Sequence, residues 1–148
     1  MAVQERELSE SGIVTIDPGN SIRDAAEIME RQNVGCLVVV DNDEKPVGIL
    51  TDRDLALKVL DDVANIDGVD VRDVMTKDPV TVEKGSNILN LFKIMANNSV
   101  RRLPITEDGR VINIITFDDM IRLLAGELGE LADVLSSESS RKNIRDFF

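Results

Sequence analysis

The chain has 148 residues, a net charge of −11, 43% hydrophobic residues and 30% charged residues. This composition is typical of a globular protein long enough to bury a core, and the acidic charge argues against binding to a nucleic-acid polymer, whose phosphates require a basic surface. The absence of histidine removes the commonest general base and metal ligand, so we expect neither catalysis nor a bound metal.

The apolar runs, the first residues and the cysteine content indicate where in the cell the protein is expected. The longest apolar run, Cys36–Val40, is too short to span a membrane. The first residues do not resemble a signal peptide, and a single cysteine excludes an internal disulfide. We therefore expect a cytoplasmic protein that does not bind membranes.

The first half of the chain predicts a β-α-β-β-α unit. Ile13–Ile16 is a short extended segment, and an amphipathic helix follows it. Two β-branched runs, Leu37–Val40 and Val47–Leu50, flank a polar turn and predict strands covered by helices. A second helix is predicted from about Thr51 to Leu60. The apolar face of the first helix consists of Ile22, Ala25, Ala26 and Met29.

The second half predicts the same order of elements. An acidic connection, Asp61–Asp78, leads to an extended segment at Val80–Val82. Strands are predicted at Leu103–Ile105 and Val111–Ile115, and a second helix begins at about Thr116. The apolar face of the intervening helix consists of Ile88, Leu91, Phe92 and Met95.

A leucine stripe predicts that the last helix continues to about Leu135, where Ser136–Ser140 should end it. Its residues are Met120, Leu124, Leu128, Leu131 and Leu135. Such a stripe is more typical of packing within a chain than of an interface. We still expect a homodimer, because the helices of so small a chain have outer faces to bury.

The two halves are copies of one unit. Val14 recurs as Val80, 66 positions later, and after a one-residue deletion in the polar turn Ile49 recurs as Ile114, 65 positions later. We predict an α+β fold of tandem β-α-β-β-α repeats packed as a pseudo-twofold pair. The expected domains are an N-terminal segment 1–9, repeat one 10–62, a linker 63–74, repeat two 75–126, and a C-terminal helix extension and tail 127–148.

The strongest motif lies where the second strand of each pair meets the second helix. It reads Gly48-Ile-Leu-Thr-Asp-Arg-Asp54 in the first copy and Asn113-Ile-Ile-Thr-Phe-Asp-Asp119 in the second. This pattern resembles the Gly-h-x-Ser/Thr-x-x-Asp signature of CBS domains. Val71–Val82 is similar to the usual lead-in to a CBS repeat, and Val100–Ile105 to its middle strand. The resemblance covers about residues 10 to 126, and it implies a regulatory pair of repeats whose clefts hold AMP, ADP, ATP or S-adenosylmethionine.

The residue chemistry of the motif suits a nucleotide. The Asp54 carboxylate can accept hydrogen bonds from a ribose diol, and Thr51 opens a helix, whose N-terminus favours phosphate. Gly48 would let the backbone approach a ligand, and Arg53 adds a positive charge. The resemblance also implies contacts by further residues of both copies, which are Thr15, Val34, Thr81, Val100, Arg101, Arg102, Thr116 and Asp119.

Simpler interpretations remain open for the same residues. Thr51 with Asp54, and Thr116 with Asp119, also fit capping boxes, which need no ligand. For Thr51 and Asp54, the repeat context favours ligand binding over simple capping. For Thr116 and Asp119 the two interpretations are equally supported, because Asn113 replaces the motif glycine. Arg101 and Arg102 also fit a solvated strand face, and Cys36 fits a buried apolar position.

We therefore expect a ligand-sensing module that binds an adenine nucleotide, most simply AMP, and shifts a homodimer or a regulated protein partner between states. The alternative is a dimerisation or interaction scaffold that binds no ligand. An enzyme is not expected, since no phosphate-binding loop, histidine base or paired thiol is present.

Overall fold

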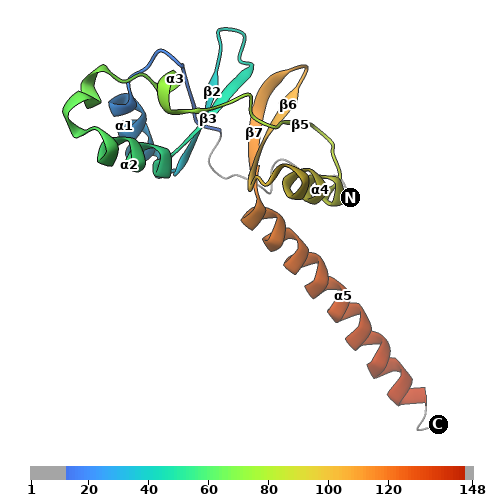
Figure 1. Cartoon of the computed structure of the whole chain (residues 1–148). Coiled ribbons are helices and arrows are strands. Elements are labelled where there is room, and N and C mark those ends of the chain that lie inside the picture. The colour runs from blue at the N-terminus through green and yellow to red at the C-terminus, as the bar shows by residue number, and fades with distance from the viewer. Residues whose placement is uncertain (1–12, 146–148) are drawn as a thin grey trace. The chain divides into compact units, whose positions relative to one another are not determined.

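The computed structural model describes residues 13–145, with side chains through Ser137, and confirms the predicted α+β fold (Figure 1). The N-terminal segment 1–9 lies outside the described residues. The first repeat contains β1 (Thr15–Ile16), α1 (Ile22–Gln32), β2 (Cys36–Val40), β3 (Pro46–Thr51) and α2 (Asp52–Asp61). The second contains β5 (Val82–Glu83), α4 (Ile88–Asn98), β6 (Arg102–Glu107), β7 (Arg110–Thr116) and α5 (Phe117–Arg145). Between them lie a 3-10 helix η2 (Val63–Gly68), α3 (Val71–Val74) and β4 (Thr76–Lys77).

Each repeat has its own small sheet. The first sheet has the strand order β1-β2-β3-β4, with β1 parallel to β2 and the other pairs antiparallel. The second has the order β5-β6-β7, with β5 parallel to β6. In the second hairpin, Asp108 and Gly109 have φ of 52° and 78°, which is the conformation of a two-residue type I′ turn. This tight turn explains the one-residue deletion in the second copy.

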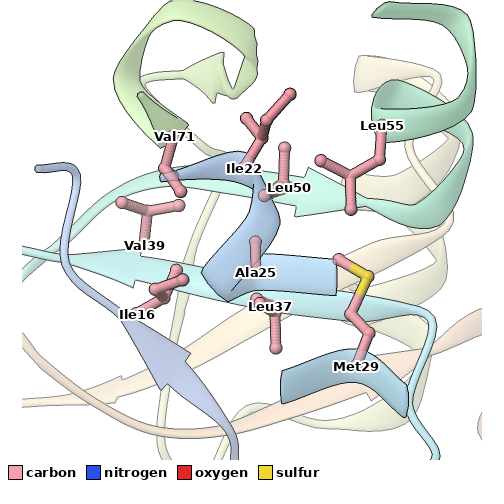
Figure 2. Packing of buried hydrophobic residues seen from close by; sticks show 9 residues of the cluster. All are labelled: Ile16, Ile22, Ala25, Met29, Leu37, Val39, Leu50, Leu55 and Val71. Carbon is pink, nitrogen blue, oxygen red and sulfur yellow. The ribbon is translucent and has the colours of Figure 1, made fainter. Parts of the chain in front are cut away.

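The first repeat is held together by a hydrophobic cluster of nine buried side chains (Figure 2). Eight of these positions are also buried in the second repeat, at the offset found in the sequence. The pairs are Ile16 and Val82, Ile22 and Ile88, Ala25 and Leu91, Met29 and Met95, Leu37 and Leu103, Val39 and Ile105, Leu50 and Ile115, and Leu55 and Met120. The prediction was too broad at two positions, since Ala26 is exposed and Phe92 only half-buried.

The connection between the repeats is docked on the first repeat. Val71 is completely buried in the first cluster, and its backbone N–H donates to the carbonyl of Asn20 at 2.8 Å. The N–H of Ile22 donates to the carbonyl of Val69 at 3.1 Å, and Arg23 pairs with Asp67 at 2.7 Å. The strand β4 then adds to the edge of β3. Since backbone hydrogen bonds fix this segment at several points, it is not a free tether.

Helix α5 is longer than the sequence predicted. It runs without a break from Phe117 to Arg145, so the expected end at Ser136–Ser140 was wrong. Serine is only a moderately poor helix former, and no glycine or proline follows Gly129. The Ser137 hydroxyl donates to the carbonyl of Val134 at 2.7 Å, so it is satisfied within the helix.

The leucine stripe of α5 is packed at its start, where Met120 is buried and Leu124 half-buried, and is exposed further along. Leu128, Leu131 and Leu135 are each at least 60% exposed. Residues up to Ile115 and residues from Thr116 onward form separate compact units, and α5 belongs to the second. Among the described helices, none is both long and apolar enough to cross a membrane.

Candidate nucleotide site

The motif of the first repeat forms a capping box at the start of α2. Thr51 is the N-cap, and its Oγ1 accepts a hydrogen bond from the N–H of Asp54 at 3.2 Å. In return, Asp54 Oδ2 accepts from the N–H of Thr51 at 2.9 Å. Both residues are half-buried, Thr51 at the end of β3 and Asp54 in the first turn of α2. The pair thus fixes the direction of the first turn of α2, where backbone N–H groups point out of the helix.

The second repeat has the same arrangement at the start of α5. Asp119 Oδ2 accepts from the N–H of Thr116 at 3.0 Å and from its hydroxyl at 2.6 Å. Thr116 Oγ1 accepts from the N–H of Asp119 at 3.1 Å. The other carboxylate oxygen, Oδ1, lies 3.7 Å from Arg122 Nη1. Both oxygens of this carboxylate therefore have partners, Thr116 at the end of β7 and Arg122 within α5.

The free acceptor of Asp54 distinguishes the first box from the second. Within the described part of the chain, Asp54 Oδ2 takes the cap hydrogen bond, and no hydrogen bond or ion pair involves Oδ1. A carboxylate oxygen has two lone pairs and readily accepts from hydroxyl groups. Oδ1 of Asp54 is consequently the acceptor that a ribose diol could use without breaking the cap.

A capping box alone does not identify a ligand site, because α1 has one too. Ser21 Oγ accepts from the N–H of Asp24, and Asp24 Oδ2 accepts from the N–H of Ser21, both at 3.0 Å. The difference lies in solvent exposure, since the bonds of the α1 box are exposed and those of the Thr51 and Thr116 boxes are partly buried. Sequence analysis did not separate these cases, because all three share the Ser/Thr-x-x-Asp spacing.

Gly48 has a structural explanation that the sequence did not reveal. A Cβ atom built there would collide with the Met75 side chain and would lie 3.1 Å from the carbonyl oxygen of Thr76. Gly48 also pairs with Lys77 in the β3–β4 ladder. The missing side chain therefore makes room for Met75 and β4. In the second repeat Asn113 occupies this position, is only 7% exposed, and accepts from the N–H of Ile114 at 2.8 Å through Oδ1.

Charges from both repeats act on Cys36. Cys36 is paired with Thr51 in the β2–β3 ladder. Burial raises the pKa of its thiol to about 11, Arg102 opposes this shift, and Asp54 and Asp52 add to it. Arg102 of β6 thus exerts its field on the same thiol as the two carboxylates at the start of α2. The second repeat thus contributes to the electrostatics at Cys36, which is paired with Thr51 of the first box, and the sequence alone did not single out Cys36 or Asp52 for this.

The other predicted residues lie on or next to the elements expected for them, and Thr81, Val100 and Arg101 come just before strands β5 and β6 instead of within them. Thr15 is exposed in β1 opposite Val38, and Thr81 is exposed just before β5. Val34 and Val100 are half-buried, and each follows a helix that ends in a left-handed residue, Asn33 or Ser99. Arg53 and Arg101 are exposed, and Arg102 is half-buried.

The structure directly joins Thr51 to Asp54 and Thr116 to Asp119. Contacts of all the predicted residues with a ligand, these four included, stay predictions. Among the described residues, no group of three acidic, cysteine or histidine side chains could hold a metal ion.

Comparison with known proteins agrees with this arrangement. The CBS domain family matches residues 6–61 and again residues 71–126. The chain belongs to the CBS-domain family. The solved CBS domain pair of protein MJ0100, in complex with 5′-methylthioadenosine and S-adenosyl-L-methionine, is 29% identical, covers 86% of this chain and 98% of that one, and has a TM-score of 0.71. The chain is therefore a CBS pair, a class of regulatory module.

Two curated relatives show how much of a longer protein such a pair occupies. The chain is 32% identical to protein MK0525 of Methanopyrus kandleri over 82% of its own length and 63% of that protein. It is 37% identical to the inosine-5′-monophosphate dehydrogenase of Methanocaldococcus jannaschii over 74% of its own length but only 21% of that enzyme. The similarity thus covers a CBS region and leaves most of that enzyme unmatched.

Proposed function

We propose that this CBS pair is a regulatory sensor that binds an adenosine-containing ligand at the Thr51–Asp54 box. The observation that carries the proposal is the half-buried Asp54 carboxylate, whose Oδ2 holds the cap while Oδ1 has no partner among the described residues. Ribose hydroxyls would donate to Oδ1, and the first turn of α2 would offer N–H groups to a phosphate. The MJ0100 pair, which is 29% identical, supports an adenosyl ligand.

The charges near the box favour a ligand with few phosphates. The first turn of α2 carries Asp52 and Asp54, and Arg53 and Arg102 are the cations that we assign to the ligand there. ATP would bring more negative charge than these two side chains can neutralise, whereas AMP would not. We therefore expect AMP to bind more tightly than ADP or ATP. S-adenosylmethionine and methylthioadenosine are the competing ligands, since neither carries phosphate.

Calorimetric titration with AMP, ADP, ATP, S-adenosylmethionine and methylthioadenosine tests the proposal. In Asp54→Asn an amide oxygen can still accept from the N–H of Thr51, but the charge and the second acceptor are lost. We expect this variant to bind the preferred ligand at least about tenfold more weakly, since a charge-assisted hydrogen bond contributes about 1.5–3 kcal/mol. The 2′-deoxy form should show a similar loss with the wild-type protein.

Asp24→Asn is the matched control, because it makes the same change in the exposed capping box of α1. It should leave ligand affinity unchanged. Equal affinity of wild type and Asp54→Asn would remove Asp54 from the site. Ligand recovered chemically unchanged after long incubation would agree with a sensor, and turnover would contradict it.

The alternative function is a scaffold that binds no ligand. The capping box of Ser21 and Asp24 on α1 supports it, because the same reciprocal hydrogen bonds occur there without any proposed ligand role. In that case none of the five compounds should produce heat of binding or a rise in melting temperature. Such a result would also mean that Thr51 and Asp54 only cap helix α2.

A further inference from the structure

Helix α5 carries a stripe of exposed apolar side chains that continues beyond the CBS repeat. The family match ends at residue 126, and Leu128, Leu131 and Leu135 beyond it are 64%, 60% and 65% exposed. Within the repeat, Ile121 is 45% exposed and Leu124 half-buried. These five residues, which we call the α5 stripe, follow one another at spacings of three, four, three and four positions. This is the heptad spacing of helices that pair along an apolar seam.

Small residues flank the α5 stripe on one side. Ala125, Gly129 and Ala132 each follow a leucine of the stripe by one position. A Cβ atom built on Gly129 would meet nothing within 4 Å, so packing within the described chain does not require a glycine there. Glycine inside a helix nevertheless costs about 1 kcal/mol relative to alanine. A second helix that approaches closely along this side would account for it.

The charges in the sequence of α5 are divided between its two ends. Asp118, Asp119, Arg122, Glu127, Glu130 and Asp133 give residues 116–135 a net charge of −4. Glu138, Arg141, Lys142 and Arg145 give residues 136–145 a net charge of +2. A parallel pair of α5 helices would place the two basic ends side by side, whereas an antiparallel pair would place the basic end of each helix beside the first turns of the other, where Asp118, Asp119 and Arg122 sum to −1.

We propose that α5 pairs with α5 of a second copy of this chain, antiparallel, along the α5 stripe. In the register that matches the leucines, Leu128 meets the partner's Leu131 and Leu124 meets the partner's Leu135. In this register the matched leucines run from Leu124 to Leu135, and Ile121 lies beyond them. The seam is 12 residues, or about 18 Å, which is less than two heptads. Because so short a seam buries little area, the dimer should dissociate in the micromolar range.

Sedimentation equilibrium of the full chain, from low to high micromolar concentration, tests the pairing. We expect a monomer–dimer equilibrium that Leu131→Glu weakens at least about hundredfold, since it buries a charge in the seam. Leu60→Glu is the control, because Leu60 on α2 is 78% exposed and makes no part of the stripe. A monomer at every concentration would overturn the proposal, and so would a dimer that Leu60→Glu disrupts and Leu131→Glu does not.

The variant Gly129→Leu distinguishes close pairing of the two helices from nonspecific hydrophobic association. The substitution adds apolar surface and raises helix propensity, so it should strengthen nonspecific association. If the helices approach along Gly129, it should weaken the dimer instead, while circular dichroism shows the helix intact. Tighter association of this variant would contradict close pairing.

Disulfide trapping tests the direction. In a Cys36→Ala background, Leu124→Cys and Leu135→Cys proteins should form a mixed disulfide when combined and little disulfide when alone. Rapid disulfide formation by each protein alone would indicate a parallel pair and overturn the proposed direction.

Discussion

Gly48 shows how one position in the motif is governed by packing. Its backbone lies in the β3–β4 ladder, and Met75 fills the space that a Cβ atom would need. We predict that Gly48→Ala lowers the free energy of unfolding by about 1–3 kcal/mol, the usual cost of overpacking a buried site. The double variant Gly48→Ala/Met75→Ala should recover part of this loss. Urea denaturation followed by circular dichroism measures both.

Gly68→Ala provides the matched comparison, because a Cβ atom there meets nothing within 4 Å and its φ is not positive. That variant should be as stable as the wild-type protein to within about 0.5 kcal/mol. If Gly48→Ala is equally neutral, Met75 has freedom to move and the packing argument for Gly48 is wrong.

The Cys36 thiol makes a second prediction at the scale of one residue. Burial raises its pKa to about 11, well above the ordinary value for a thiol. Because the thiolate is the nucleophile, alkylation by iodoacetamide should be slow at neutral pH and should accelerate only as the pH approaches 11. In protein unfolded in urea, the alkylation rate should instead rise with a midpoint at the pKa of a free thiol, about 8.5.

The same shift has a consequence for stability. The folded state holds the thiol proton more tightly than the unfolded state, so this contribution is complete below the unfolded pKa and is lost as the pH rises toward 11. Cys36→Ala should therefore lose less stability than the wild-type protein between neutral and alkaline pH. Rapid alkylation of the folded protein at neutral pH would contradict the shift.

At the scale of the elements, the spacing of apolar residues was sufficient to predict the helices and strands that bury one regular face. The helices α1 and α4 and both hairpins lie where apolar spacing predicted them. The elements η2, α3 and β4 were not predicted, because they are short and are fixed by contacts distant in sequence, such as the bond from Val71 to Asn20. The end of α5 was missed because serine weakens a helix without stopping it.

The candidate site was predictable to the same limited extent. The spacing of Thr51 and Asp54 correctly indicated a helix start, and the repeat context assigned the pair to the CBS motif. The spacing did not distinguish this box from that of Ser21 and Asp24, since the difference lies in tertiary burial. It also did not reveal that Met75 occupies the space beside Gly48.

At the scale of the whole molecule, the duplicated buried positions contrast with the unequal motifs. The positions of Leu50 and Leu55 are matched by Ile115 and Met120, which are also buried, so both repeats bury the same positions. By contrast, Gly48 is replaced by Asn113, and both oxygens of Asp119 have partners while Asp54 Oδ1 has none in the described chain. The repeats therefore share their packing and differ in the chemistry offered to a ligand.

The second motif and the α5 stripe lie on the same helix, which leads to a prediction about coupling. Thr116 and Asp119 form the start of α5, and Leu128 follows Asp119 by nine residues, or about 13 Å along the helix. The proposed site is the first motif, so this prediction concerns a second ligand molecule, whose phosphate would bind the N–H groups of the first turn of α5. Such binding would order the helix, and an ordered helix loses less entropy on pairing. We predict that a saturating adenosyl ligand tightens the α5 dimer at least about fivefold, within the usual range of coupling energies.

Ligand binding and dimerisation are thermodynamically linked, so the predicted coupling can be measured in two independent ways. If ligand tightens the dimer by some factor, then dimerisation must tighten ligand binding by the same factor. Calorimetry should therefore show weaker ligand binding to monomeric Leu131→Glu than to the wild-type dimer, by the factor that sedimentation gives for dimerisation with and without ligand. Asp119→Asn, which leaves the stripe intact, should abolish the coupling and keep the dimer. A ligand that binds while the dimer constant stays unchanged would show that binding is confined to the first motif and that α5 is not part of the response.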